Sequence, residues 1–274
     1  MKLNILIGGE AGQGINKVTG IVSSILSKYG YFTFNYRDYP SLIRGGHNFN
    51  VLTISDKRVG SNESKLDGII ALDNKTIDLH KKELKDEGFT INSKGFKDLG
   101  RNLNIALAGA LIKILGIDKK LLLEEIDLEF SDKKEPKAAA EKGYESQEKK
   151  ADLKKLDHKI KISFGSKAVA DGAVNSEIAL YIAYPMTPAT NTMHELASMQ
   201  EKEKFMVFQA ENELAVANAA LGASFTGART MIGTSGGGFD LTGKSDIADL
   251  FAGLARLSKA SAKRWRKPKS QIIR

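Results

Sequence analysis

The stretch that decides the fold runs from residue 3 to residue 28 and reads LNILIGGEAGQGINKVTGIVSSILSK. Its beginning, Leu3–Ile7, is apolar apart from one Asn and predicts a short buried strand. From Ile15 to Leu26 the apolar residues recur at helical spacing, and Gly30 follows as a C-terminal cap. A strand, a glycine-rich turn and a helix in this order predict an α/β domain.

The same alternation continues to about residue 130. Three more strands and one helix that is apolar almost all round are expected at Tyr31–Asn35, Phe49–Ile54, Gly68–Leu72 and Asn104–Leu115. We therefore predict a first α/β domain over residues 1–130 with a doubly wound, mostly parallel sheet.

Residues 131–161 are rich in Lys and Glu, contain Pro136 and have few large apolar side chains, so they predict a charged linker without fixed structure. A second α/β domain is expected over residues 162–241. Its predicted helices are Asp171–Tyr181, Asn191–Glu201 and Glu213–Phe225, and its predicted strands are 182–184, 205–209 and 229–234.

Composition excludes several classes of protein. The 274 residues include no Cys, which rules out disulfides and thiolate-held zinc or iron–sulfur clusters on this chain. The sequence contains no run of about 18 apolar residues, so no membrane-spanning helix is expected. The N-terminal strand reaches Gly8 too soon for a signal peptide, so we expect a cytoplasmic protein that does not associate with a membrane.

The net charge of +8 is unevenly distributed. Residues 243–274 hold nine Lys or Arg and two Asp, which is a surplus of seven positive charges, and the rest of the chain carries only +1. The body of the protein therefore lacks the basic bias of a nucleic-acid-binding surface. A nucleic-acid-binding protein with a basic C-terminal arm remains a disfavoured alternative.

The first domain contains two motifs that are candidate functional segments. Residues 8–14, GGEAGQG, form a turn between a strand and a helix that suits either tight packing or a ligand, but match neither the Walker nor the dinucleotide fingerprint. Residues 39–48 read YPSLIRGGHN. In this loop Arg44 is either solvated or functional, and His47 is either a general base or a side chain that only satisfies hydrogen bonds; the sequence leaves both roles open.

Together these two motifs resemble the gamma domain of the 2-oxoacid:ferredoxin oxidoreductases. The resemblance covers residues 1 to about 120. It implies a gamma-type doubly wound α/β domain that packs beside the catalytic domains and carries no catalytic residue itself.

The second domain contains the stretch AYPMTPAT at residues 183–190. By itself this is a stiff, proline-flanked turn in which Thr190 caps the next helix. It is similar to the Tyr-Pro-Ile-Thr-Pro loop of the same family. The resemblance implies that Thr187 binds the carboxylate or carbonyl of the 2-oxoacid substrate and that Tyr184 and Pro185 lie at the cofactor.

Residues 209–215 read QAENELA, and a carboxylate at the start of a helix is also explained by the helix dipole alone. The stretch resembles the family's Glu-x-Glu-x-Ala segment. That resemblance implies that Glu213 is the catalytic carboxylate that contacts N1′ of thiamine diphosphate, with Glu211 the weaker candidate. The glycine turn TSGGGF at residues 234–239 resembles the family's turn beside the cofactor.

The whole chain thus resembles an alpha subunit with a fused gamma domain and an incomplete thiamine-diphosphate pyrimidine-binding domain. The implied reaction is oxidative decarboxylation of a 2-oxoacid to its acyl-CoA, with ferredoxin as electron acceptor. The implied partner is a beta subunit that shares the thiamine diphosphate and holds Mg²⁺ and a [4Fe-4S] cluster. Pyruvate, 2-oxoglutarate and branched-chain 2-oxoacids all remain candidate substrates.

The resemblance stops after Leu241. We expect residues 242–274 to be a basic tail that is non-native or disordered, as a truncated or frameshifted reading frame would produce, and we expect the second domain to be unstable as encoded. The alternative function is therefore a non-catalytic, truncated remnant that acts only as an assembly module.

Overall fold

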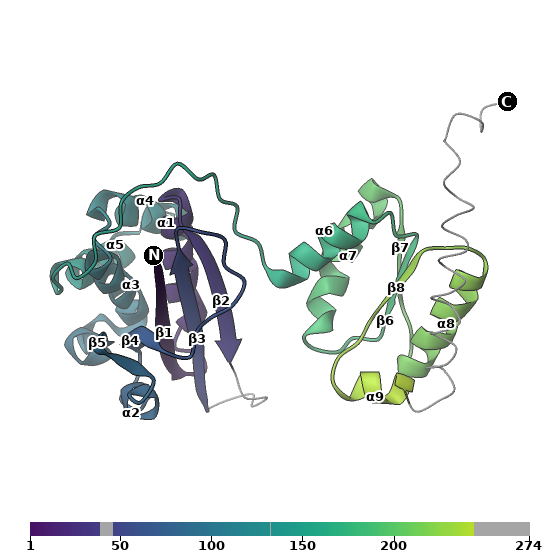
Figure 1. The fold of residues 1–274 in the computed structure, drawn as a ribbon, viewed down its shortest axis with the longest axis horizontal. Helices are drawn as coiled ribbons and strands as arrows, with labels where there is room; N and C mark the ends of the chain where they lie inside the picture. The colour runs from purple at the N-terminus through teal and green to yellow at the C-terminus, as the bar shows by residue number, and fades with distance from the viewer. Residues whose placement is uncertain (39–45, 132, 244–274) are drawn as a thin grey trace. The chain divides into compact units, whose positions relative to one another are not determined.

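The computed structural model describes residues 1–38, 46–131 and 133–243. The chain forms two compact units, Met1–Ile162 and Ser163–Arg274 (Figure 1). Within the described ranges, no helix is long and apolar enough to span a membrane. The predicted basic tail lies outside the described residues, except for residues 242 and 243 at the end of the last helix.

Unit 1 is built on a five-stranded sheet with the order β2-β3-β1-β4-β5. Its strands are β1 (Lys2–Glu10), β2 (Phe32–Asp38), β3 (His47–Ser55), β4 (Leu66–Ala71) and β5 (Leu84–Asn92). The α/β class is confirmed, but the sheet is mixed, because β3 runs antiparallel to both of its neighbours while β1, β4 and β5 are parallel. The connection from β2 to β3 has eight residues, which is too short for the crossover that a parallel pair requires.

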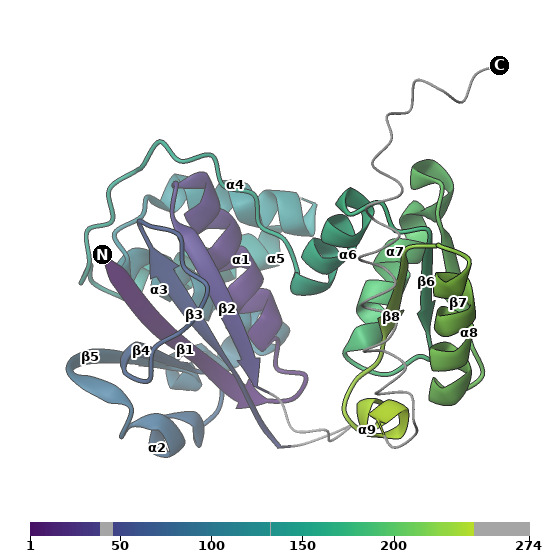
Figure 2. The same ribbon diagram turned by 45° about the vertical axis from the view of Figure 1, so that its right-hand side comes forward.

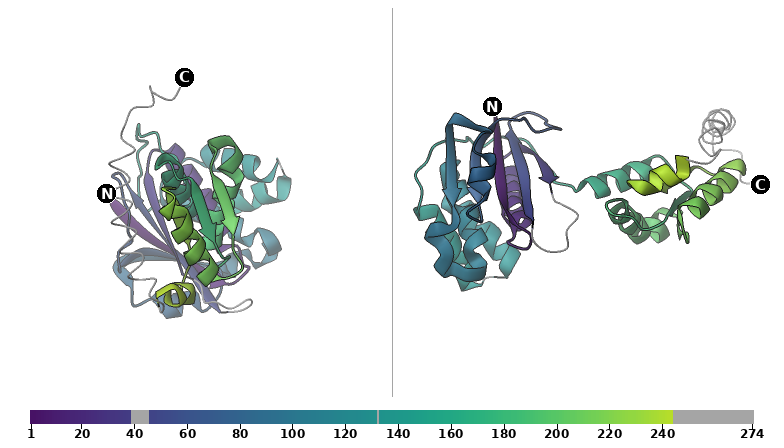
Figure 3. Two further views of the ribbon diagram at one scale, coloured as in Figure 1. Left: turned by 90° about the vertical axis from the view of Figure 1, so that its right-hand side faces the viewer. Right: turned by 90° about the horizontal axis from the view of Figure 1, so that it is seen from below.

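Helices cover one face of this sheet in two layers (Figures 2 and 3). They are α1 (Ile15–Lys28), α3 (Leu103–Ile114), α4 (Lys119–Phe130) and α5 (Lys134–Glu145). The side chains of α1 and α3 form one core with those of β1 and β3, and α4 and α5 extend this core behind them. The short helix α2 (Thr76–His80) packs on the other face through Ile77, and the 3-10 helix η1 (Ser93–Asn102) leads into α3.

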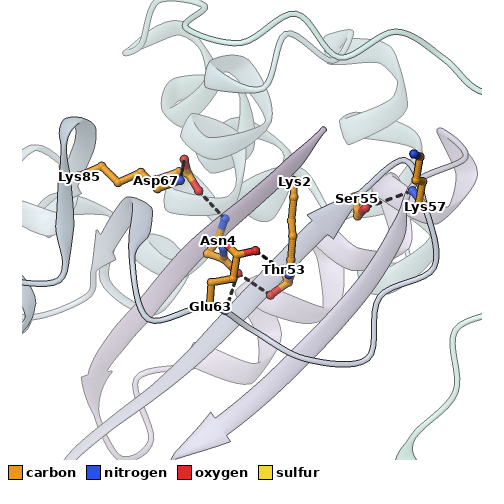
Figure 4. A network of polar contacts seen from close by, with 8 residues as sticks. All are labelled: Lys2, Asn4, Thr53, Ser55, Lys57, Glu63, Asp67 and Lys85. Atoms are coloured by element: carbon orange, nitrogen blue, oxygen red, sulfur yellow. Dashed lines mark hydrogen bonds and ion pairs between the residues drawn. The ribbon is translucent and has the colours of Figure 1, made fainter.

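A polar network joins β1 to β3, β4 and β5 on the second face of the sheet (Figure 4). Thr53 donates to Asn4 Oδ1 at 2.7 Å, and both side chains are fully buried. The Asn4 backbone N–H donates to Asp67 Oδ2 at 2.8 Å, and Lys85 pairs with the other oxygen of Asp67 at 2.7 Å. These bonds satisfy Asn4 Oδ1, the Asn4 backbone N–H and both oxygens of Asp67, whereas Asn4 Nδ2 is buried without a partner among the described residues.

The expectation of an unstructured linker over residues 131–161 is wrong. Residues 134–145 form α5, which packs on α3 through Pro136, Ala139, Ala140 and Gly143. These small residues recur at helical spacing, so they bury a complete face of the helix while adding little to the apparent hydrophobicity of the sequence. Its lysines form ion pairs with neighbouring elements, as Lys142 does with Asp98 at 2.6 Å.

The chain after α5 also remains part of unit 1. Leu153 is buried in the core, the Leu156 N–H donates to the Tyr29 carbonyl at 3.0 Å, and the Tyr31 hydroxyl donates to the Lys154 carbonyl at 3.0 Å. The first unit therefore ends near residue 162 rather than residue 130.

Unit 2 contains a three-stranded parallel sheet with the order β7-β6-β8. Its elements are α6 (Gly165–Asn175), β6 (Leu180–Ala183), α7 (Ala189–Glu203), β7 (Met206–Gln209), α8 (Glu213–Phe225), β8 (Thr230–Gly233) and α9 (Gly237–Gly243). Helices α6 and α7 cover one face of the sheet and α8 covers the other (Figure 1). The predicted strands are confirmed, but the first helix begins at Gly165 and ends before Leu180 and Tyr181, which belong to β6.

Candidate functional site

The three predicted site segments of unit 2 lie at one edge of its sheet. Residues 184–188 follow the end of β6, Glu213 opens α8 shortly after the end of β7, and residues 234–238 follow the end of β8. Because the strands are parallel, their carboxyl ends share an edge, and this is the edge at which open α/β sheets bind ligands. Residues more than 50 positions apart are therefore brought to one place.

The loop after β6 presents Thr187 to solvent. Its hydroxyl makes no hydrogen bond to any other described residue, so it is available to a ligand. Tyr184 is about one-third exposed, with a relative accessibility of 37%, and Pro185 is half-buried. The Thr187–Pro188 peptide bond is cis. Thr190 is not the helix cap that we expected, because it lies inside α7 and its N–H donates to the Met186 carbonyl at 2.9 Å.

Glu213 is the first residue of α8 and is half-buried. The Asn212 side chain caps this helix by accepting a hydrogen bond from the Ala215 N–H at 2.9 Å. Within the part of the chain that the structure describes, no side chain pairs with the Glu213 carboxylate, which leaves its oxygens free to accept from a ligand. Glu211 lies in the preceding loop and is exposed.

The glycine turn after β8 contacts both of the other segments. Ser235 donates a hydrogen bond to the Thr187 carbonyl at 2.8 Å. A Cβ atom on Gly238 would collide with Thr234 Oγ1 and would lie 2.7 Å from Met186 Sδ and 3.1 Å from Glu213 Cγ, so the glycine lies close to both segments. At Gly236 and Gly237 a Cβ would meet no atom within 4 Å, which leaves open space beside the turn.

The glycine motif of unit 1 has a packing reason for its composition. Gly8 and Gly9 lie inside β1, where a Cβ would come within 2.7 Å of Thr76 Cγ2 and 2.9 Å of Leu72 Cβ, respectively. Gly14 has a φ of +88° and caps α1. Of the two interpretations that the sequence left open, these contacts favour tight packing.

His47 forms a pair that the sequence does not reveal. Its Nε2 lies 2.8 Å from Nε2 of His80, whose Nδ1 lies 3.0 Å from a Glu83 oxygen. If His80 donates to Glu83, its Nε2 accepts from His47, and Nδ1 of His47 is then the unprotonated nitrogen. This Nδ1 is buried and has no partner among the described residues, so a proton there finds no acceptor.

Burial, followed by the neighbouring His80, accordingly lowers the pKa of His47, while the carboxylates of Asp73 and Asp38 act in the opposite direction. The two histidines are 33 residues apart, and no sequence spacing indicates their contact. Arg44, the other open question in this motif, lies outside the described residues.

A carboxylate and a glycine turn at the carboxyl edge of a parallel sheet lie where open α/β proteins bind ligands and cofactors, so this chain has the site of that class of protein. Comparisons with known proteins narrow this class. Residues 4–99 match the family model "Pyruvate ferredoxin/flavodoxin oxidoreductase". Residues 171–245 match the model "Pyruvate flavodoxin/ferredoxin oxidoreductase, thiamine diP-bdg", which describes a thiamine-diphosphate-binding domain.

The chain is similar to alpha subunits of 2-oxoacid:ferredoxin oxidoreductases. It is 28% identical to the 2-oxoacid:ferredoxin oxidoreductase subunit alpha of Sulfolobus sp over 88% of this chain and 51% of that protein. It is 38% identical to the 2-oxoglutarate synthase subunit KorA of Archaeoglobus fulgidus over 28% of this chain and 22% of that protein. The chain thus spans about half the length of the first of these relatives.

The fold also matches a solved structure. The 2-oxoglutarate:ferredoxin oxidoreductase from Magnetococcus marinus, with 2-oxoglutarate, coenzyme A and succinyl-CoA bound, aligns with a TM-score of 0.76 at 22% identity. The alignment covers 88% of this chain and 49% of that chain. At this identity the likeness establishes the shared fold.

Proposed function

We propose that this chain is part of an enzyme that oxidatively decarboxylates a 2-oxoacid to its acyl-CoA, with ferredoxin as electron acceptor. The observation that carries the proposal is the carboxylate of Glu213, which has no side-chain partner among the described residues and whose Cγ lies next to Gly238 of the glycine turn at the carboxyl edge of the sheet. The match of residues 171–245 to the thiamine-diphosphate-binding model suggests the ligand that we propose for this carboxylate, the aminopyrimidine of thiamine diphosphate.

The residues present fit the pyrimidine end of that cofactor. A free carboxylate oxygen suits a protonated ring nitrogen, and the open space at Gly236 and Gly237 leaves room for a flat ring. When bound, thiamine diphosphate supplies the carbanion chemistry that breaks the bond to the departing carboxylate. Glu213 would hold a proton at the ring nitrogen, Thr187 would bind the substrate, and Tyr184 and Pro185 would border the cofactor.

A partner subunit belongs to this proposal. Several large apolar side chains of unit 2 are exposed, among them Phe225 (83%), Met206 (61%) and Leu214 (48%). These side chains are apolar surface of unit 2 that is available to a partner subunit. We assign Mg²⁺, the diphosphate end of the cofactor and a [4Fe-4S] cluster to a beta subunit, and CoA and ferredoxin to the assembled enzyme.

Purification of the chain together with a beta subunit tests the proposal. The complex should reduce a viologen dye in the presence of CoA and a 2-oxoacid. The panel of substrates should contain 2-oxoglutarate, pyruvate and a branched-chain 2-oxoacid, with 2-oxoglutarate expected among those accepted because KorA relatives and the Magnetococcus enzyme carry that name.

The variant Glu213→Gln should lower kcat by about 10²- to 10⁴-fold, the range for loss of a positioned proton-transfer group. Glu211→Gln, two residues upstream and exposed, is the matched control and should leave kcat near that of the parent. A complex that assembles but turns over no 2-oxoacid would instead support the alternative, a non-catalytic assembly module.

A further inference from the structure

The loop that carries Thr187 is restrained unequally along its length. Pro185 and Pro188 have fixed φ angles because of their rings, and Pro188 also restricts the ψ angle of Thr187. The Thr187 carbonyl carbon is bonded to the Cα that carries the threonine side chain. A hydrogen bond to the Thr187 carbonyl therefore holds this part of the backbone, and with it the Cα of Thr187, in place.

Ser235 makes this contact. It is the second residue after β8, and its hydroxyl donates to the Thr187 carbonyl at 2.8 Å across 48 residues of sequence. The same turn is held on its other side, where Gly238 packs between Met186 and Glu213. The turn thus links the proposed substrate-binding segment to the proposed catalytic carboxylate.

We propose that Ser235 is a positioning residue that fixes the Thr187 peptide so that the threonine hydroxyl meets the carboxylate of the 2-oxoacid. The inference rests on the proposed function. In this proposal Ser235 acts through Thr187 and not on the cofactor beside the same turn, so its loss should affect substrate binding and leave the binding of thiamine diphosphate unchanged.

The matched control is Ser176. This serine also donates to a backbone carbonyl at 2.8 Å in an exposed hydrogen bond, but it precedes β6 and lies at the opposite end of that strand. Ser235→Ala should raise the KM for the 2-oxoacid about three- to tenfold, the effect of one lost hydrogen bond, with kcat changed less than KM. Ser176→Ala should leave KM unchanged, and Ser235→Thr, which keeps the hydroxyl, should restore the parent value.

The experiment uses the complex of the full chain with its beta subunit and measures three quantities. They are the KM for the 2-oxoacid, the Kd for thiamine diphosphate by titration calorimetry, and the hydrogen exchange of residues 184–190. Exchange should accelerate in Ser235→Ala and stay unchanged in Ser176→Ala, whether or not the complex turns over substrate.

Three results would overturn the inference: a KM that is unchanged in Ser235→Ala, a Kd for thiamine diphosphate that rises together with KM, or a threonine variant that fails to restore KM. Inactivity of the parent complex would refute the proposed function. The hydrogen exchange of residues 184–190 then tests the positioning role of Ser235 independently of turnover. Equal exchange in the parent and in Ser235→Ala would refute this role.

Discussion

Gly143 in α5 tests whether residues 134–145 belong to the core of unit 1. A Cβ added there would lie 2.7 Å from Cα of Ala106 in α3 and 2.5 Å from its carbonyl carbon, whereas ordinary contact begins at 3.4 Å. The Ala106 carbonyl oxygen would lie nearer still, so the variant Gly143→Ala requires α5 to withdraw from α3 by more than about 0.9 Å, because backbone atoms have no rotamer to escape into.

The cost follows from that displacement. Overpacking of a core by one methyl group costs about 1 to 3 kcal/mol, and a collision with backbone belongs in the upper part of this range. Replacement of Gly by Ala in a helix returns at most about 1 kcal/mol. We expect Gly143→Ala to lower the free energy of unfolding of unit 1 by about 1 to 2 kcal/mol.

Gly20→Ala is the matched control. Gly20 lies inside α1, where a Cβ would meet no atom within 4 Å, so this variant should raise stability by about 0.5 to 1 kcal/mol. Urea unfolding followed by far-UV circular dichroism should shift in opposite directions for the two variants. With an m-value of about 2 kcal/mol/M, the midpoint of Gly143→Ala falls by about 0.5 to 1 M.

Hydrogen exchange of residues 134–145 assigns the change to unit 1, since a chain of two units need not unfold in one step. A Gly143→Ala variant that is as stable as the parent, or that gains stability together with Gly20→Ala, would refute the packing of α5 on α3. That result would instead support an unstructured linker over residues 134–145.

Two further predictions concern groups elsewhere in the fold. Because the pKa of His47 is lowered in the folded state, its contribution to stability is present above the unfolded pKa of about 6.5 and is lost as the pH falls toward the folded pKa. The melting temperature of unit 1 should therefore drop between about pH 7 and pH 5. His47→Gln should make this dependence of melting temperature on pH less steep. A steeper slope in His47→Gln would contradict the assignment. In unit 2, Gly233→Ala should destabilise by about 1 to 3 kcal/mol, because its Cβ would collide with the hydroxyl of the buried Tyr181. Tyr181→Phe in that background should recover part of the loss in a thermal melt, and no recovery would mean that the hydroxyl is not the obstacle.

Local periodicity in the sequence was sufficient for most elements. The apolar spacing from Ile15 to Leu26 predicts α1, and the Ala-rich run from Glu213 to Phe225 predicts α8 with the observed bounds. Both signals arise because a helix repeats its buried face every three to four residues, a property that needs no knowledge of the partner. The motifs around Thr187 and Glu213 also predicted the family, which the comparisons confirm.

Contacts between distant segments required the tertiary structure. Residues 134–145 look like a solvated linker in isolation, and only the approach of α3 to Ala139, Ala140 and Gly143 shows why small residues suffice to bury that face. His47 contacts His80 because β3 and α2 converge, and the separation of the two residues in the sequence does not indicate this contact.

In the candidate site, too, some features follow from the sequence and others only from the tertiary structure. The sequence by itself determined which residue types are present at Thr187, Glu213 and the glycine turn, because each motif is local. Only the parallel order of β6, β7 and β8 decided that these segments share one edge and that Ser235 holds the Thr187 carbonyl. Residue chemistry is a property of short stretches, whereas proximity depends on how the strands pair.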